Sequence, residues 1–199
     1  MGNPGLPAPA GETVAYRWAR SEDAAAVAGL HAESWRRHYR GSYPDAFLDG
    51  PVFENRAAVW DERLAALVGD GDPDAGTVTI LAESGSGDLV GFVHVVLDDD
   101  PAWGALVDNL HVRADLKGGG IGTSLLARAA GAVVARRPSS GLFLWVLEAN
   151  VEAQAFYLAR GGGFQGTRIA TAPGGGEPLV AIRCVWPDPH VLLEAPTPT

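Results

Sequence analysis

The chain is poor in cysteine and in long apolar runs, and each shortage excludes a class of protein. Cys184 is the single cysteine, so no intrachain disulfide can form, and the sequence suits a reducing compartment. No segment approaches about 18 consecutive apolar residues, so we predict no transmembrane helix. Residues 1–13 contain neither Lys nor Arg and have no long apolar core, unlike a signal peptide. By exclusion, we expect a cytoplasmic protein.

Positive charge is also scarce. The chain has 15 Lys and Arg residues against 24 Asp and Glu, which gives a formal net charge of −9. Because nucleic acids and anionic membranes are bound by basic surfaces, we expect neither as a partner. An acidic chain is compatible with a cationic amine as its ligand. The 199 residues, 47% of them apolar and 20% charged, are typical of a single globular enzyme domain.

Signatures of metal and covalent chemistry are missing as well. Among five histidines and one cysteine, the nearest approach to a ligand pair is His31 and His38, which are seven positions apart. This spacing is not that of a metal site, and we expect no metal. The Gly-x-Ser-x-Gly elbow of serine hydrolases is absent too.

The pattern of apolar residues predicts one α+β domain over residues 14–186, between flexible segments at 1–13 and 187–199. The expected order is strand, two helices, three strands, helix, strand, helix and two strands. Ser21 would cap the first helix, and a turn around Tyr43 and Pro44 would lead toward the second. Beside the segment described next, we expect strands at 14–19, 77–84, 88–97, 142–147, 164–170 and 179–186, a helix near 54–68, and turns at 69–76 and 173–176.

Residues 107–126 are the most informative segment. They predict a short apolar strand, a glycine-rich turn and the start of an amphipathic helix. Backbone N–H groups at a helix N-terminus bind anions, and glycine lets the chain approach a ligand closely. We therefore expect a phosphate-bearing ligand at this turn.

Two common phosphate-binding motifs do not fit the turn. A P-loop requires a lysine after the glycines, whereas Lys117 precedes them. A dinucleotide motif requires Gly-x-Gly-x-x-Gly, but Thr123 occupies the sixth position counted from Gly118. A formal match at residues 161–166 follows a predicted helix rather than opening one, and we interpret it as chance.

Two segments resemble the GCN5-related N-acetyltransferases. The first, Lys117-Gly118-Gly119-Gly120-Ile121-Gly122, is similar to the family's acyl-CoA motif Gln/Arg-x-x-Gly-x-Gly/Ala, with lysine in place of Gln or Arg. The second, residues 150–157, resembles its Asn-x-x-Ala-x-x-Phe-Tyr helix, which ends in a Gly-Phe step. Additional glycines precede that step here, in residues 160–164, and predict a looser loop. The two segments occur in the right order, which strengthens the resemblance.

The resemblance implies a fold, a co-substrate and a reaction. The fold would be a GNAT-type mixed, mostly antiparallel sheet of about seven strands flanked by four helices. Acetyl-CoA would donate its acetyl group to a primary amine by direct attack in a ternary complex. Tyr157 would be the general acid, and Asn150 would hold the pantetheine arm. The residues implied in cofactor binding are Leu110, His111, Val112, Lys117, Gly118, Gly119, Gly120, Ile121, Gly122, Thr123, Asn150, Phe156 and Tyr157.

The residue that takes the amine proton is left open. Asp108 and His111 are candidates, Glu83 and Glu148 lie on or beside strands near the expected cleft, and bulk water could serve without a dedicated base. Asp108 could equally be a solvated carboxylate at a strand end. His111 alternates with its neighbours, so it could instead be a packed histidine on the other face of the sheet.

Trp35, Tyr39 and Tyr43 are spaced by four and could wall a pocket for the acceptor amine, although Trp35 could equally belong to the core. The partner would be a small-molecule or peptide amine, such as an antibiotic, a polyamine, an amino acid or a protein N-terminus. The protein would be a monomer or a homodimer. The alternatives are a non-catalytic acyl-CoA-binding module on the same fold, an ATP-binding protein, and a donor with an acyl group longer than acetyl.

Overall fold

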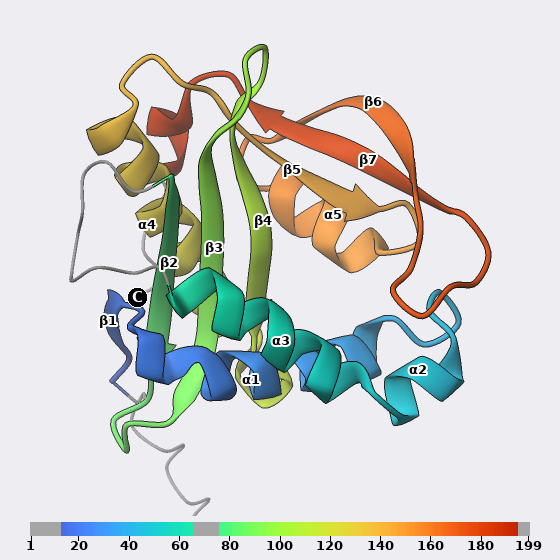
Figure 1. Cartoon of the computed structure of the whole chain (residues 1–199). Helices are drawn as coiled ribbons and strands as arrows, with labels where there is room; N and C mark the ends of the chain where they lie inside the picture. Colours follow the sequence, from blue (N-terminus) through green and yellow to red (C-terminus); the bar gives the residue numbers. More distant parts are fainter. Residues whose placement is uncertain (1–12, 66–75, 195–199) are drawn as a thin grey trace, which may run out of the picture.

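The computed structural model describes residues 13–65 and 76–194. At its centre is a seven-stranded sheet with the order β1-β2-β3-β4-β5-β7-β6 (Figure 1). Only β4 and β5 are parallel neighbours, so this is the mixed, mostly antiparallel sheet that the sequence predicts. The strands are β1 (Ala15–Trp18), β2 (Thr77–Glu83), β3 (Leu89–Asp100), β4 (Gly104–Val112), β5 (Leu142–Leu147), β6 (Gly163–Ala170) and β7 (Leu179–Trp186). The helices are η1 (Ser21–Asp23), α1 (Ala24–His38), α2 (Asp45–Asp49), α3 (Val52–Ala65), η2 (Ala114–Leu116), α4 (Ile121–Arg136), α5 (Val151–Leu158) and η3 (Pro189–Leu192).

Helices cover both faces of the sheet. Side chains alternate along β2, so Ile80 joins the apolar cluster beneath α4, whereas Leu81 joins the cluster beneath α1 and α3. Gly91 of β3 lets the first turn of α4 come close, because a Cβ there would lie 3.1 Å from Leu125 Cδ1 and 3.3 Å from Ile121 Cγ2. This packing fixes the N-terminal end of α4 against the sheet. The apolar stripe of α4 is buried at Leu125, Leu126, Ala129, Ala130 and Val133.

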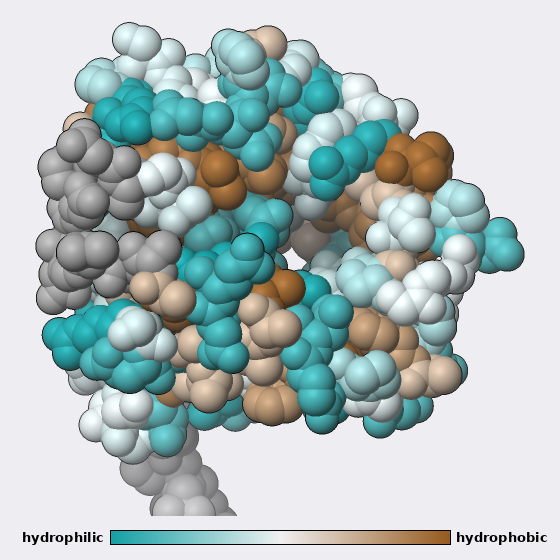
Figure 2. Space-filling model, in the orientation of Figure 1, coloured by the Kyte–Doolittle hydropathy of each residue, from teal (hydrophilic) through white to brown (hydrophobic). Residues whose placement is uncertain are grey.

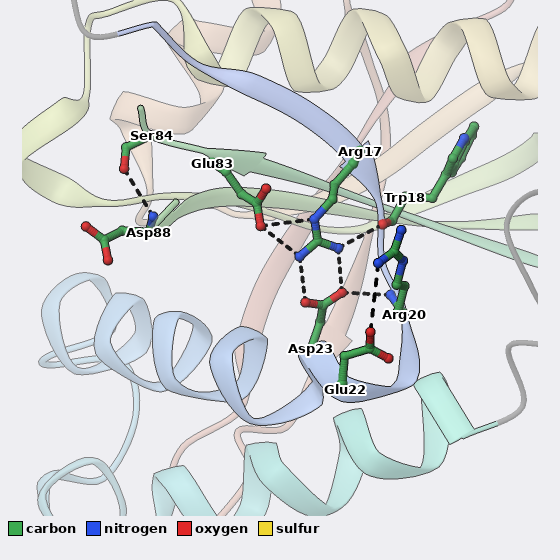
Figure 3. Close-up of polar contacts among 8 residues, drawn as sticks. All are labelled: Arg17, Trp18, Arg20, Glu22, Asp23, Glu83, Ser84 and Asp88. Carbon is green, nitrogen blue, oxygen red and sulfur yellow. Dashed lines mark hydrogen bonds and ion pairs between the residues drawn. The ribbon is translucent and has the colours of Figure 1, made fainter. Parts of the chain in front are cut away.

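An ion-paired cluster ties β1 to β2 and to the start of α1 (Figure 3). Arg17 donates to both carboxylate oxygens of Asp23 at 2.7 Å, and its Nη2 also donates to Glu83 Oε1 at 2.7 Å. These hydrogen bonds from Arg17 hold the pKa of Asp23 below its ordinary value. Asp23 Oδ2 also accepts the backbone N–H of Arg20 at 2.7 Å. Asp23, rather than the predicted Ser21, therefore organises this helix start, because Ser21 lies within η1.

Three features differ from the sequence prediction. The turn at Tyr43 and Pro44 leads into an additional five-residue helix, α2, so five α-helices rather than four flank the sheet in the described part of the chain. The segment after residue 186, expected to be flexible, continues into η3, whose Leu192 is buried in the main core. The loop before β6 is tight rather than loose, because buried Gly162 packs directly against Cys184 and Trp186.

Several predicted features lie outside the described residues. These are residues 1–12 of the expected N-terminal lead, positions 66–68 of the helix near 54–68, positions 69–75 of the following turn, and residues 195–199. Within the two described ranges, no helix combines the length and the apolar character needed to cross a bilayer.

Candidate functional site

The parallel strands β4 and β5 pair only where both begin. Ala105 lies opposite Leu142 and Leu106 opposite Phe143, and no further pair between these strands follows among the described residues. From residue 107 to residue 112, the edge of β4 that faces β5 therefore keeps backbone N–H and C=O groups without a strand partner. Such an edge can hydrogen-bond an extended ligand. The molecule is hollowed where the two strands separate (Figure 2).

A pocket of about 520 Å³ occupies this gap. One end lies at the glycine turn before α4, the middle between β4, β5 and α5, and the other end at α1, α3 and β6. The pocket brings together every residue predicted for the site except Gly119, which lies in the turn between Gly118 and Gly120. A single cavity therefore joins the two motifs to the aromatic cluster.

The glycine turn leaves the start of α4 open to an anion. Gly118 and Gly120 have φ angles of 83° and 84°, a region in which residues with a Cβ are strained. Gly120 is the N-cap residue and has no side chain to cap the helix, and the first helical bond runs from Ser124 N to its carbonyl at 2.9 Å. The N–H groups of residues 121–123 precede that bond and have no helical acceptor. Together with the helix dipole, they form an anion-binding end of the pocket.

Lys117 lies at the mouth of this end. Its Nζ is 2.9 Å from His38 Nε2 at the end of α1 and 3.3 Å from Glu152 Oε2 in the first turn of α5. His38 Nδ1 lies 2.8 Å from the carbonyl oxygen of Ser34 and donates to it, which leaves Nε2 to accept from Lys117. The lysine therefore links α1 to α5 across the turn, with its charge partly balanced by one carboxylate.

Arg160 provides a second cation at the same end, and the sequence analysis did not identify it. Its Nε donates to Thr123 Oγ1 at 2.9 Å, and its Nη1 donates to the carbonyl of Phe156 at 2.7 Å. The guanidinium lies over the ring of Phe156, 3.6 Å from the centroid. The same ring packs against Gly122, where a Cβ would lie 3.4 Å from Phe156 Cζ. The fold alone joins Arg160 to the first turn of α4.

Helix α5 places Asn150 and Tyr157 on the pocket. Asn150 Oδ1 accepts the N–H of Ala153 at 3.1 Å and caps the helix. Tyr157, about two turns later, is 9% exposed and packs edge-on against Phe156 and Trp186. Burial raises the pKa of its hydroxyl above the ordinary value. The hydroxyl is therefore protonated at neutral pH and can donate a hydrogen bond to a ligand.

A β-bulge at Asp108 sets the direction of the side chains at the end of β4. The residues on either side of it pair with consecutive residues of β3, so Asp108 has no partner there. Val107 before the bulge and Leu110 after it both belong to the cluster beneath α4. His111 is consequently turned toward α1, where it lines the pocket.

His111 is held against α1 by Ser34. Ser34 Oγ lies 2.8 Å from His111 Nδ1, and the ring of His31 is 4.6 Å away between centroids. Burial is the main cause that lowers the pKa of His111 to about 3. The imidazole is therefore neutral at pH 7. His111 lies on the face opposite Leu110 and Val112, as its alternation predicts, and there it both packs against His31 and lines the pocket.

Asp108 also lines the pocket, but it already has an ion-pair partner. Its Oδ2 lies 2.7 Å from Arg63 Nη2 and accepts a hydrogen bond from Asn109 Nδ2 at 2.6 Å. The other two candidate carboxylates are elsewhere. Glu83 belongs to the ion-paired cluster of Figure 3, Glu148 is exposed after β5, and neither lines the pocket.

An aromatic cluster forms one wall of the far end, as the spacing of four predicts. The rings of Trp35 and Tyr43 are 5.2 Å apart between centroids, and those of Tyr39 and Tyr43 are 4.6 Å apart. Trp35 is only 7% exposed, so it belongs to both the core and the pocket. The loop between β6 and β7 reaches α2 on this side, where Gly174 lies against Phe47 (Figure 1).

Three arginines of this far end were not anticipated from the sequence. Arg56 and Arg63 come from α3, and Arg168 comes from β6. The two on α3 are seven residues apart, about two helical turns, so they project to the same side. That spacing is the only signal in the sequence, and it does not say what the side faces. No group of three or more His, Cys, Asp or Glu in the described ranges could hold a metal ion.

Comparison with known proteins shows the family of the chain. A model of the acetyltransferase (GNAT) family matches residues 32–164, more than half of the chain. The chain belongs to this family. No curated protein matches the chain.

Solved structures of other GNAT proteins share the fold. PaiA N-acetyltransferase from Thermoplasma acidophilum, solved with coenzyme A, is 16% identical, with a TM-score of 0.62 over 85% of this chain and 98% of that one. YncA from Salmonella typhimurium, a putative acetyltransferase solved with acetyl-CoA, is 17% identical, with a TM-score of 0.60 over 87% and 93%. The spermidine/spermine N-acetyltransferase SpeG from Vibrio cholerae is 13% identical, with a TM-score of 0.60 over 92% and 100%.

Proposed function

We propose that this GNAT protein transfers an acetyl group from acetyl-CoA to a primary amine. The observation that carries the proposal is the single pocket that joins the anion-binding end of α4, Tyr157 and the α1–α3 side of the sheet. A donor entering from one end and an amine entering from the other would meet in the gap between β4 and β5. Direct transfer in a ternary complex requires that arrangement.

The residues of the donor end fit acetyl-CoA, which supplies the activated acetyl group when it is bound. The N–H groups at the start of α4 and the cations of Lys117 and Arg160 suit a pyrophosphate. The unpaired edge of β4 suits the amide groups of a pantetheine arm, and Asn150 lies on the opposite wall. Bound coenzyme A in PaiA and bound acetyl-CoA in YncA support this assignment.

Tyr157 is the proposed general acid. In the reaction the amine loses one proton and the departing sulfur gains one, so a donor near the thioester accelerates collapse of the intermediate. The raised pKa keeps the Tyr157 hydroxyl protonated through the neutral range. Within the described residues, the Tyr157 hydroxyl makes no hydrogen bond to another protein group, so it is available to donate one to the ligand.

Asp108 is the proposed acceptor of the amine proton. Its carboxylate stands at the bulge of β4, beside the pocket, and its Oδ2 is fixed by Arg63 while Oδ1 is left for the amine. His111, whose imidazole is neutral at pH 7, is proposed to accept a hydrogen bond from the amine. Trp35, Tyr39 and Tyr43 would wall the acceptor.

The proposal includes no covalent enzyme intermediate. Cys184 is fully buried behind Gly162, and burial raises the pKa of its thiol to about 12. A thiol in that state is neither reactive nor accessible. It is also absent from the residues that line the pocket.

Thiol release from acetyl-CoA in the presence of a panel of primary amines tests this function. Tyr157→Phe should lower kcat by roughly 10²- to 10⁴-fold while the Kd for acetyl-CoA changes little, because the ring is kept and only the acid is lost. Tyr16→Phe is the matched control, since Tyr16 stacks with Arg128 outside the pocket. Wild-type turnover that is unaffected by Tyr157→Phe would refute the acid role. Binding of acetyl-CoA without transfer to any amine would favour a non-catalytic acyl-CoA-binding module.

A further inference from the structure

The far end of the pocket carries an excess of positive charge. Three arginines line it, Arg56 and Arg63 of α3 and Arg168 of β6, and we call them the arginine wall. Asp108 is the only carboxylate among the described residues that line this end. The donor end has two cations of its own, Lys117 and Arg160, so the arginine wall is not needed for the phosphates of the donor. Its presence in a chain of net charge −9 runs against the overall composition.

Each guanidinium of the arginine wall stacks on a tryptophan ring. The guanidinium carbon of Arg56 lies 4.1 Å from the ring centroid of Trp35, and that of Arg168 lies 4.4 Å from the centroid of Trp145. Arg63 lies 5.2 Å from the centroid of Trp60. Stacking fixes the plane of a guanidinium without neutralising its charge, and it leaves the N–H edges for another partner. The two arginines nearest their rings are therefore oriented in advance of any ligand.

The positive charge of the arginine wall is not balanced by carboxylates of the described residues. Arg63 pairs with Asp108 through Nη2, but its Nη1 is buried and has no hydrogen-bond partner. The polar contacts of Arg56 run to the neutral amide of Asn55, and no carboxylate in the described chain lies within ion-pair distance of it. Burial, with repulsion from Arg63, lowers the pKa of Arg56, and burial lowers that of Arg168. Arg56 and Arg63 are partly buried, whereas Arg168 is exposed. A partly buried cation without a full counter-charge destabilises a protein unless a ligand supplies the missing charge.

We infer that the acceptor carries an anionic group, a carboxylate or a phosphate, close to its reacting amine, and that the arginine wall binds this group. The inference rests on the proposed acetyl transfer and specifies its substrate class. Asp108 would face the amine, while Arg56 and Arg168 would take the anion by charge-assisted hydrogen bonds. A polyamine fits poorly, because its additional cations would meet three arginines. An amino acid, the C-terminus of a very short peptide, or an amino-sugar or amino-alcohol phosphate has the required charges.

Matched pairs of acceptors test the inference. Thiol release from acetyl-CoA is measured with amino acids against their carboxamides and the corresponding decarboxylated amines, and with phosphoethanolamine against ethanolamine. The anionic member of at least one series should have a kcat/KM about 10- to 100-fold higher than its neutral partner, as expected for a charged hydrogen bond. The series in which this difference appears tells a carboxylate from a phosphate.

A substitution in the arginine wall tests whether the wall causes the preference for anionic acceptors. Arg56→Gln should lower kcat/KM at least about tenfold more for the anionic acceptor than for its neutral partner, while the Kd for acetyl-CoA stays near that of the wild type. Arg128→Gln is the matched control, because Arg128 also stacks on an aromatic ring, 4.1 Å from the centroid of Tyr16, but lies outside the pocket. It should leave both kcat/KM values unchanged.

A binding measurement covers the case in which no acceptor of the panel is acetylated. With the donor end saturated by coenzyme A, inorganic phosphate or acetate is titrated against sodium chloride at equal ionic strength, and tryptophan fluorescence is recorded. Trp35 and Trp145 lie directly beneath arginines of the wall, so an anion bound there should give a saturable change that Arg56→Gln abolishes.

The outcomes separate this inference from the proposed function. Turnover with equal or higher kcat/KM for neutral amines, and no differential effect of Arg56→Gln, would overturn the inference and leave acetyl transfer standing. No saturable fluorescence change in the wild type would overturn it as well. Failure of the wild type to bind acetyl-CoA would instead refute the proposed function, and the comparison of the wild type with Arg56→Gln in the anion titration would still tell binding at the wall from binding at the donor end.

Discussion

Gly162 occupies a position at which a side chain has no room. A Cβ there would lie 2.5 Å from Cys184 Sγ and 2.9 Å from Trp186 Cζ2. Its N–H donates to the carbonyl of Tyr157 at 3.1 Å, so the position also joins the end of α5 to the sheet. We predict that Gly162→Ala destabilises the protein by about 1–3 kcal/mol through overpacking, as measured by urea unfolding.

Gly163→Ala is the control for this prediction. Gly163 lies one residue further, has no positive φ, and a Cβ there would meet nothing within 4 Å. Its free energy of unfolding should stay within about 0.5 kcal/mol of the wild type. Equal effects of the two substitutions would mean that chain flexibility, and not the contact with Cys184, explains the glycine.

At the scale of single residues, the sequence predicts the site residues that belong to one local motif. The glycines of the turn, Asn150 and Tyr157 could be named because their spacing within one strand–turn–helix segment or one helix implies a common site. Arg56 and Arg168 could not be predicted as site residues, because they come from α3 and β6 and line one pocket only in the folded molecule. The direction of the His111 side chain depends on the bulge at Asp108. A bulge arises from the pairing of β4 with β3 and cannot be recognised in the sequence of β4 alone.

At the scale of elements, α5 depends on Asn150 for its start. The side-chain oxygen caps the helix through Ala153 N–H, while the side-chain amide is proposed to bind the pantetheine arm. Asn150→Asp should keep the cap and the free energy of unfolding within about 0.5 kcal/mol, because Asp caps as well as Asn, yet weaken acetyl-CoA binding through loss of the amide donor. The Kd from calorimetry and the unfolding free energy are measured together.

Asn150→Ala removes both functions and provides the comparison. It should cost about 1 kcal/mol of stability in addition to the loss in affinity. If Asn150→Asp binds acetyl-CoA as tightly as the wild type, the residue only caps α5 and does not contact the donor.

Most elements could be predicted because their apolar periodicity is strong. The strands β5 and β7 coincide with the predicted ranges 142–147 and 179–186, and β2 and β3 lie close to the predicted ranges 77–84 and 88–97. Helix α2 could not be predicted, since five residues give too few apolar positions to define a period. The packing of η3 depends on Leu192 meeting α4, a long-range contact that composition near the C-terminus does not reveal.

At the scale of the whole molecule, buried neutral histidines make stability depend on pH. His31 accepts a hydrogen bond from Trp60 Nε1 at 3.0 Å, and His94 Nδ1 lies 2.7 Å from Thr79 Oγ1. Burial lowers the pKa of His31 well below its ordinary value and that of His94 to about 4. In the unfolded chain both would titrate near pH 6.5. Below that pH the unfolded state binds more protons than the folded state, so stability is lost as the pH falls.

We therefore predict that the free energy of unfolding is nearly constant above pH 7 and falls between pH 6.5 and pH 4, with His94 alone contributing on the order of 3 kcal/mol of the loss and His31 adding to it. Urea unfolding at a series of pH values measures this loss. His190→Gln should change the curve little between pH 7 and pH 4.5, because His190 is exposed in η3 and its ion pair with Asp188 lies at the surface. A curve that is flat from pH 7 to pH 4.5 would contradict the assignment of neutral buried histidines.

The net charge of the whole chain does not describe its pocket. A value of −9 suggested a cationic acceptor, whereas the far end of the pocket carries three arginines against one aspartate. Local charge decides what a cleft binds because its partly desolvated groups interact more strongly than screened charges on the surface. The composition gives only the net charge of the chain, whereas the fold shows which charged residues line the pocket.

Acetyl-CoA binding is the claim on which the account depends most directly. Calorimetric titration of the purified protein with acetyl-CoA, with coenzyme A and ATP as comparators, tests it in one measurement. We expect micromolar binding of acetyl-CoA and no comparable binding of ATP, because the turn at Gly118–Gly120 and the open edge of β4 together fit a pyrophosphate joined to a pantetheine arm. Absence of acetyl-CoA binding, or tighter binding of ATP, would contradict it.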